Sequence, residues 1–277
     1  MRTLIALALS LTLIAGCANL GEVRGFAGES ARLAGYTKIT ERYLASYQRE
    51  RPFLLPGPAR QAEAALDARR QAARDSLLAV HRVAFRYMAT LAQLAGADSF
   101  NLDTPIDKLA ANLKAFPDLG LDAATVDATA SLAKSLSNMV LSAAQESAVR
   151  KLVTEDGPKA QRLFEGMQNI ASLFDKSLNN EKKMVLATLV DGAAIEEQTK
   201  GSPLLVALAL DKAREKKAEY AADEADYQAA LQGLQAIARG HRDLMDNIDH
   251  LDTTDLRQRL AKYRDQIRAV GASLQQL

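Results

Sequence analysis

Apolar residues recur every seven positions through long stretches of this 277-residue chain, and this period constrains the fold more than any other feature. The clearest example lies between residues 59 and 95. Two interleaved series follow the seven-residue step there: Leu66, Ala73, Val80, Tyr87 and Leu94, with Leu77, Ala84 and Leu91 between them. A sustained heptad places apolar side chains along one seam of a helix, which favours long helices packed nearly parallel or antiparallel. The pattern predicts an all-α fold, an elongated helical bundle.

Short joints rich in proline and glycine divide the heptad stretches. Trp is absent, and no stretch alternates apolar and polar residues with β-branched side chains, so we expect no sheet. We expect helices over residues 29–48, 59–95, 122–154, 158–199, 203–248 and 254–277, and a short helix from Thr104-Pro105 to about Phe116. The polar residues 179–183 leave open whether 158–199 forms one helix or two. The seven-residue step from Leu178 to Val185 favours one.

The first residues have the order of an export signal. Arg2 precedes an apolar segment from Leu4 to Ala15 that is too short to span a bilayer stably, and Ile14-Ala15-Gly16-Cys17 follows. This order resembles the lipobox signal peptide of Gram-negative bacterial lipoproteins, and Cys17 is the only cysteine. The resemblance implies cleavage before Cys17 and acylation of its thiol. Ala18, where Asp would favour the inner membrane, implies an outer-membrane lipoprotein that faces the periplasm.

These features divide the chain into three parts. Residues 1–16 form the cleaved signal peptide, and residues 17–28 form the lipidated N-terminus and a tether that its glycines should make flexible: Gly21, Gly25 and Gly28. Residues 29–277 form a single helical domain. Beyond the lipobox, this domain has a general similarity to helical envelope lipoproteins of proteobacteria, without a diagnostic motif.

The sequence contains none of the familiar catalytic or cofactor signatures. It lacks a glycine-rich phosphate loop, a nucleophile elbow and the paired Glu-x-x-His motifs of di-iron bundles. Basic and acidic residues balance, with a formal net charge of +1, which argues against nucleic acid as a partner. We therefore expect no enzyme activity, no cofactor and no metal.

Two polar residues interrupt apolar seams. His241 lies seven residues after Leu234, where burial would make it either a core histidine bonded to a Tyr or Glu of a neighbouring helix, or a ligand or acid–base group. The first interpretation is favoured. Glu224 interrupts the seam between Tyr220 and Leu231, where a buried charge can fix helix register or mark a partner site. His250 and Asp246 share a helix face, but two ligands are too few for zinc.

Three tyrosines of the first helix supply amphipathic area for a protein contact: Tyr36, Tyr43 and Tyr47. Leu204 to Leu210 is apolar on all sides. We expect this segment to be buried inside the bundle, and the alternative is an element that probes a membrane or binds a partner.

The sequence as a whole favours a non-enzymatic, lipid-anchored envelope protein that acts as a helical scaffold or interaction module. Its partners would be the membrane, through the acyl chains, and an envelope protein. The alternative is a carrier or sensor for an apolar ligand held between helices, with space at alanines of the seams: Ala73, Ala84 and Ala238. A membrane-perturbing helical protein is a further alternative, because it would use the apolar residues 204–210.

Overall fold

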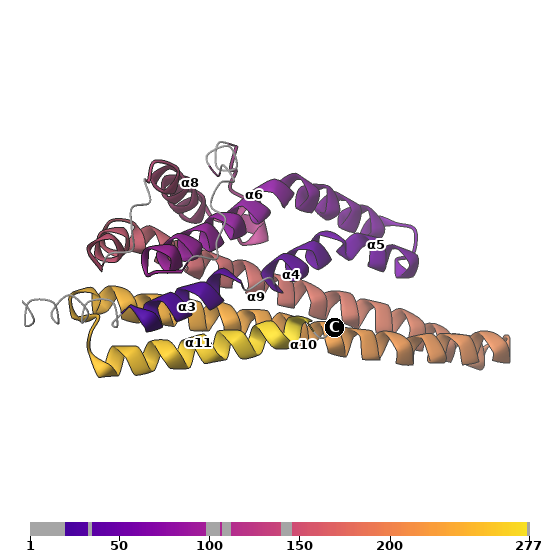
Figure 1. The fold of residues 1–277 in the computed structure, drawn as a ribbon. Coiled ribbons are helices and arrows are strands. Elements are labelled where there is room, and N and C mark those ends of the chain that lie inside the picture. Colours follow the sequence, from indigo (N-terminus) through magenta and orange to yellow (C-terminus); the bar gives the residue numbers. More distant parts are fainter. Residues whose placement is uncertain (1–19, 33–34, 98–105, 107–111, 140–145, 276–277) are drawn as a thin grey trace, which may run out of the picture.

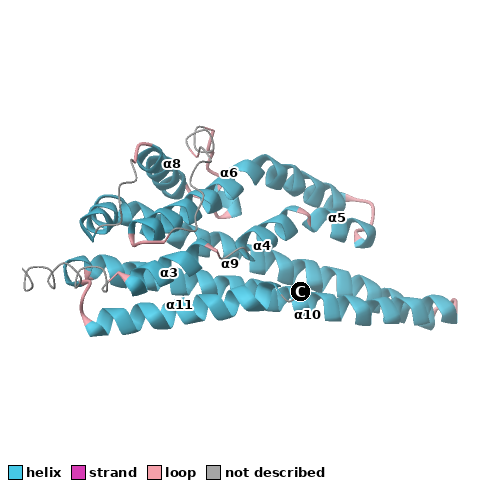
Figure 2. Cartoon of the chain, in the orientation of Figure 1, coloured by secondary structure: helices cyan, strands magenta, loops and turns pink. Residues whose placement is uncertain are grey.

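A computed structural model describes residues 20–32, 35–97, 106, 112–139 and 146–275, and these residues form an all-α helical bundle (Figures 1 and 2). No strand occurs among them, apart from one isolated bridge between Phe116 and Leu121. The helices in chain order are α3 (Gly21–Ala31), α4 (Gly35–Leu44), α5 (Ser46–Glu50), α6 (Pro58–Leu94), α8 (Ala123–Ser137), α9 (Glu146–Gln198), α10 (Pro203–Asp246) and α11 (Thr254–Gln275), with 3-10 turns at Arg51–Phe53, Pro117–Leu119 and Ile248–His250.

Two long antiparallel helices, α9 and α10, form the spine of the molecule (Figure 1). With 53 and 44 residues at about 1.5 Å per residue, they are about 80 Å and 66 Å long. α11 folds back along α10, and α3 lies between α11 and α6. α4, α6 and α8 cover α9 from the other side. The distal part of the α9–α10 hairpin extends beyond every other element, at the end opposite α3 (Figure 1).

The helix boundaries confirm most of the heptad prediction. α6 runs from Pro58 to Leu94, and its seam residues from Ala73 to Leu94 are buried in one continuous core. Two of the predicted helix starts have side-chain N-caps: the Asp122 carboxylate accepts from Thr125 N at 2.7 Å, and the Ser202 hydroxyl accepts from Leu205 N at 3.5 Å. α9 is continuous through residues 179–183, as the step from Leu178 to Val185 favoured.

The predicted break at Gly157-Pro158 is wrong. Pro158 lies inside α9, which begins at Glu146. The helix predicted over residues 122–154 is divided between α8, which ends at Ser137, and α9. An interior proline costs about 3 kcal/mol or more, because it removes one backbone hydrogen bond and crowds the preceding turn. Burial on both sides of this position outweighs that cost: Val153, Asp156, Gly157, Ala160 and Gln161 are all buried. Tertiary packing therefore overrides the local signal.

The flexible tether predicted over residues 17–28 is also wrong for the residues that the structure describes. Residues 21–31 form α3, whose buried side chains follow a helical period: Val23, Phe26, Ala27 and Ser30. The Phe26 ring fits over Gly240 of α10, where a Cβ atom would lie 2.5 Å from Cε2. Two ion pairs join α3 to α11, Glu22 with Arg264 at 2.6 Å and Glu29 with Arg268 at 3.0 Å. These contacts offset the poor helix propensity of the glycines.

The first predicted helix, residues 29–48, is divided among three helices. α3 ends at Ala31, and a second interruption at Ala45 separates α4 from α5. Cys17 and Ala18 lie outside the described residues. Of the short helix predicted from Thr104-Pro105 to about Phe116, only residues 106 and 112–116 are described, and none of these is helical.

Candidate functional site

His241 is a fully buried core residue, as the favoured interpretation of the sequence predicted. Its Nε2 lies 2.9 Å from the Tyr87 hydroxyl, and its Nδ1 lies 2.9 Å from Oε1 of Gln161. The ring packs edge-on against Tyr87 and Phe164. Burial lowers the pKa of His241 to about 3, so the imidazole is neutral. Both ring nitrogens have partners, which leaves no atom free for a ligand or for proton transfer.

Most of the tyrosine surface that was predicted to contact another protein is buried within the bundle. Tyr36 and Tyr43 are buried, and both rings contact Phe174 of α9, with the Tyr43 ring stacked at a centroid distance of 4.2 Å. Tyr47 is only partly exposed. The predicted surface is therefore wrong for Tyr36 and Tyr43, because the apolar face that they share is the face that attaches α4 to the bundle.

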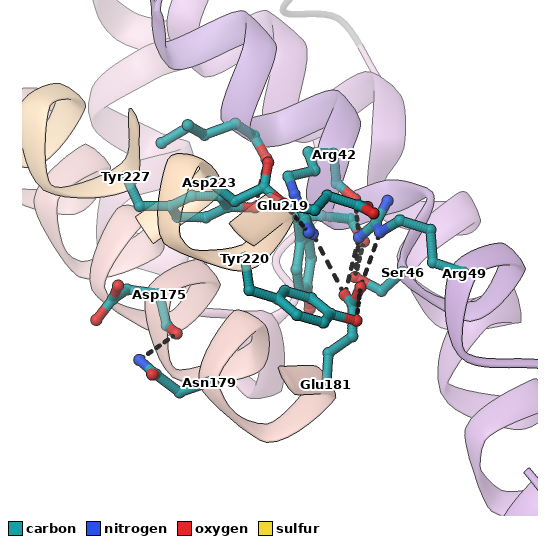
Figure 3. Close-up of polar contacts among 12 residues, drawn as sticks. Arg42, Ser46, Arg49, Asp175, Asn179, Glu181, Glu219, Tyr220, Asp223 and Tyr227 are labelled. Atoms are coloured by element: carbon teal, nitrogen blue, oxygen red, sulfur yellow. Dashed lines mark hydrogen bonds and ion pairs between the residues drawn. The ribbon is translucent and has the colours of Figure 1, made fainter. Parts of the chain in front are cut away.

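The most concentrated polar site lies around Glu181, a fully buried residue of α9 (Figure 3). We define the Glu181 cluster as Arg42, Arg49, Glu181, Tyr220 and Asp223. Arg49 donates through Nε and Nη2 to the two carboxylate oxygens at 2.8 and 2.9 Å. Arg42 donates to the same carboxylate at 3.3 Å and also pairs with Asp223, while the Tyr220 hydroxyl donates to Glu181 at 3.1 Å. Three parts of the bundle meet here: α4 with α5, α9 and α10.

The interruption at Ala45 belongs to this site. A helix end leaves backbone carbonyls without their usual partners. Arg49 Nη2 donates to the Arg42 carbonyl at 2.8 Å, and Gln71 Nε2 of α6 donates to the Leu44 carbonyl at 2.7 Å. The side chains that attach α4 and α5 to the bundle therefore also stabilise the break between these helices.

The Glu181 cluster is balanced in charge and fully bonded. Two guanidinium groups face two carboxylates, and burial would lower the pKa of Arg42, but its bond to Asp223 and the charge of Glu181 raise it instead. Because Glu181 already accepts four hydrogen bonds, it has no lone pair in position to act as a general base or to bind a metal. The role of this arrangement is therefore structural: it attaches α4 and α5 to α9 and α10 at the base of the projecting hairpin.

A second buried carboxyl group lies beside this cluster. Glu50, the last residue of α5, is 7% exposed. Burial, and then the negative charge of Glu63 on α6, raise the pKa of Glu50 to about 8. Glu63 itself accepts from Arg70 at 2.5 Å. Glu50 is thus the carboxyl group of this region that should gain or lose a proton near neutral pH.

Glu224 connects the two long helices. Both of its oxygens accept from Lys182 Nζ of α9, at 2.7 and 2.9 Å. A cross-helix pair at one point of an antiparallel hairpin favours a single register, which is one of the two roles that the sequence left open. His250 is exposed in the 3-10 turn after α10, and no ion pair with Asp246 occurs in the described structure.

Two cavities bear on the alternative of an apolar ligand. The first, about 230 Å³, includes Ala238, but the other side chains around it are polar: Gln161, Glu165, Gln168, Gln235, Arg239 and Arg242. The second, about 420 Å³, lies among α6, α8 and α9, where Leu94, Met139, Ala148 and Leu152 alternate with Ser135, Asn138, Lys151 and Glu155. Ala73 and Ala84 are buried within the core. Neither cavity has the mainly apolar wall expected of such a carrier site.

The segment from Leu204 to Leu210 is exposed, which contradicts the expectation of burial inside the bundle. Leu204, Leu205, Leu208 and Leu210 are 66%, 56%, 57% and 41% exposed. The reason is that α10 begins in the part of the hairpin that no third helix reaches, so only its face toward α9 is covered. We define the hairpin tip as residues 189–211. It also exposes Val190 and Ile195.

Within the described residues, no group of three His, Cys, Asp or Glu side chains is placed to hold a metal ion. None of the helices that are described has an apolar stretch long enough to cross a bilayer. No protein-family model matches the chain, and neither a curated protein nor a solved structure shows significant similarity to it.

Proposed function

We propose that this chain is a lipid-anchored envelope protein, a non-enzymatic helical scaffold whose projecting hairpin binds another protein. The observation that carries the proposal is the position of the exposed apolar side chains. All the large ones among the described residues lie at the hairpin end of the molecule: Leu55, Val190, Ile195, Leu204, Leu205, Leu208 and Leu210. Exposed apolar patches of this kind are typical of interaction sites.

The anchor and the hairpin tip would lie at opposite ends. Leu20, the first described residue, lies at the end of the bundle where α3 begins, and the hairpin extends away from it (Figure 1). Acylation at Cys17 would therefore hold one end at the membrane. The Ala18 sorting signal supports the periplasmic side of the outer membrane.

A protein partner fits the tip better than the interior of a bilayer does. Asp191, Glu196 and Glu197 belong to the tip, and Lys200 is the only cation between them and Asp211. Burying these charges in hydrocarbon would cost several kcal/mol. A protein groove can cover the leucines and leave the charges at a solvated rim. The acidic balance of the tip also disfavours an anionic lipid surface.

The anchor is tested by Cys17→Ser. If Cys17 is acylated, the serine variant should accumulate as an unprocessed precursor without incorporated fatty acid, and its membrane fractionation should change. Normal processing and labelling of the variant would contradict the lipoprotein assignment.

The tip is tested by affinity purification from detergent-solubilised envelopes. The double variant Leu204→Asp/Leu208→Asp should lose partner proteins that the wild type retains. Ala222→Asp is the matched control, because it places a charge at an exposed position of the same helix outside the tip. Equal recovery of partners by the tip variant would contradict the proposal.

A further inference from the structure

A second segment near the hairpin tip also exposes a large apolar side chain. We define the joint as residues 51–60, which connect α5 to α6 and include the first three residues of α6. It carries Leu55, which is 81% exposed and is the most exposed large apolar side chain described. The joint rests on α9, where the Thr188 hydroxyl lies 3.4 Å from the Phe53 carbonyl oxygen. Beyond Thr188 the hairpin continues alone (Figure 1). The molecule therefore has two exposed apolar surfaces at one end, the joint and the hairpin tip.

These two surfaces carry opposite charge. At the tip, Asp191 and Glu197 are exposed and have no ion pair within the described chain, whereas Asp211 pairs with Arg214. The joint contains Arg51 and Arg60 and no acidic residue, and neither arginine forms an ion pair with a described residue. Lys200 offsets part of the charge at the tip, which remains acidic. Each surface thus combines exposed apolar area with a net charge, acidic at the tip and basic at the joint.

The spacing of the two surfaces suits a two-fold arrangement. From Thr188 to the turn at residues 199–202, α9 advances about 15–20 Å, at about 1.5 Å per residue. A two-fold axis perpendicular to the hairpin, midway along this distance, places the tip of each copy against the joint of the other. Such a contact is isologous and closed, so it produces a dimer and not a filament.

We propose that the occupant of the hairpin tip is a second copy of this chain, which forms an antiparallel dimer through reciprocal contacts between tip and joint. The two hairpins overlap as a short four-helix bundle, in which the leucines of each copy are covered by the other. A standard interface uses about 20–30 residues from each partner, and residues 189–211 together with 51–60 are of that order. This inference rests on the proposed interaction function and names its partner.

Charge reversal at each surface tests the pairing in the full-length lipidated protein. The tip variant is Asp191→Arg/Glu197→Arg, and the joint variant is Arg51→Glu/Arg60→Glu. Dimerisation is measured by analytical ultracentrifugation in density-matched detergent. The wild type should dimerise, and each variant alone should weaken the dimer by about tenfold or more, since like charges then meet at both contacts.

An equimolar mixture of the two variants gives the sharpest result. In the mixed dimer, the arginines of the tip variant meet the glutamates of the joint variant, and the other contact is wild type on both sides. The mixture should therefore recover wild-type dimerisation. Circular dichroism of each variant separates loss of assembly from loss of folding. The substituted side chains are at the surface, so the helical signal and thermal midpoint should stay close to those of the wild type.

Three results would overturn the inference: a wild type that is monomeric at every concentration, variants that dimerise as the wild type does, or a mixture that fails to recover. A monomer whose tip captures a different protein would refute the second copy and leave the interaction function standing. A monomer whose tip inserts into phospholipid vesicles would refute both.

Discussion

Buried ionisable side chains determine how this bundle responds to pH and to substitution. His241 and Glu50 lie in different parts of the core, and burial favours the neutral form of each. For the histidine this lowers the pKa, and for the carboxyl group it raises the pKa. Their effects on stability therefore have opposite dependence on pH.

His241→Gln should lower the free energy of unfolding at neutral pH by about 1–3 kcal/mol, because the flexible amide directs its donor and acceptor differently from the two ring nitrogens, so that Tyr87 or Gln161 loses its partner. The unfolded chain binds a proton at His241 below pH 6.5, but the folded chain does so only near pH 3, so wild-type stability falls as the pH decreases through this window. The deficit of the variant should shrink there. Urea titrations from pH 7.5 to 4.5 measure both effects. Unchanged stability together with loss of a bound metal or partner would make His241 a functional residue.

Glu50→Gln should have the opposite dependence on pH. Between pH 4.5 and about 8 the folded protein retains a proton on Glu50 that the unfolded chain releases, so wild-type stability falls as the pH rises. The variant lacks this loss and should be more stable than the wild type at pH 8.5, by about 1–3 kcal/mol. Glu197→Gln, at an exposed and unpaired position, is the control and should change stability by less than about 0.5 kcal/mol. A Glu50 variant that is less stable at pH 8.5 would show that the ionised carboxylate is bonded favourably.

The sequence contained a signal for Glu181 that the heptad analysis did not use. Glu181 follows Leu178 by three positions and precedes Val185 by four, which is a seam position of α9. Arg42 and Arg49 are also seven residues apart, so they share a side of the first helices. The period alone predicts burial of Glu181, but not its two arginine partners, because these come from segments more than 130 residues away. By contrast, the seam and the chemistry of His241 were sufficient to predict a core histidine bonded to a Tyr or Glu of a neighbouring helix, and the structure has Tyr87 and Gln161 as its partners.

At the scale of helices, local signals were reliable where packing agreed with them. The caps at Asp122 and Ser202 and the seam of α6 needed no tertiary information. The errors at Gly157-Pro158 and at residues 17–28 have one cause. In both places glycine or proline weakens the helix, and contacts with distant helices, through Met245 and Gly240 of α10, restore it. Contacts between residues so distant in sequence cannot be predicted from local sequence patterns.

Pro158→Ala should raise the free energy of unfolding by about 1–3 kcal/mol if α9 is continuous, because alanine supplies the missing backbone donor and removes the clash in the preceding turn. Thermal and urea unfolding measure the change. A proline within a turn behaves differently, since it stabilises by restricting the unfolded chain. Reduced stability of the alanine variant would therefore indicate that Pro158 lies in a turn between two helices, as the sequence pattern predicted.

Gly240→Ala tests the docking of α3. The added Cβ would lie 2.5 Å from the Phe26 ring, so the variant should lose about 1–3 kcal/mol of stability or more. Gly271→Ala is the matched control in α11: its Cβ meets no atom within 4 Å, and it should gain about 0.5–1 kcal/mol from helix propensity. Equal behaviour of the two variants in urea unfolding would mean that α3 does not pack on α10.

The molecule as a whole is a bundle with one uncovered end. Near α3, α9 and α10 are covered by other helices, and the Glu181 cluster fastens α4 and α5 to them at the base of the hairpin. Beyond Thr188 only two helices remain, and a pair of helices can cover only one face of each. The seven-residue period predicted the long helices, but it carried no information about where the covering helices end. For this reason the sequence pattern placed residues 204–210 in the core, and the structure exposes them.

The proposed function requires that the hairpin tip be the surface through which the protein contacts another protein. The most direct measurement introduces a photo-crosslinking amino acid at Leu208 in intact cells, with Ala222 as the control position on the same helix. The account predicts discrete crosslinked protein adducts from position 208 and none from position 222. Crosslinks at both positions alike, or an absence of protein adducts at position 208, would contradict it.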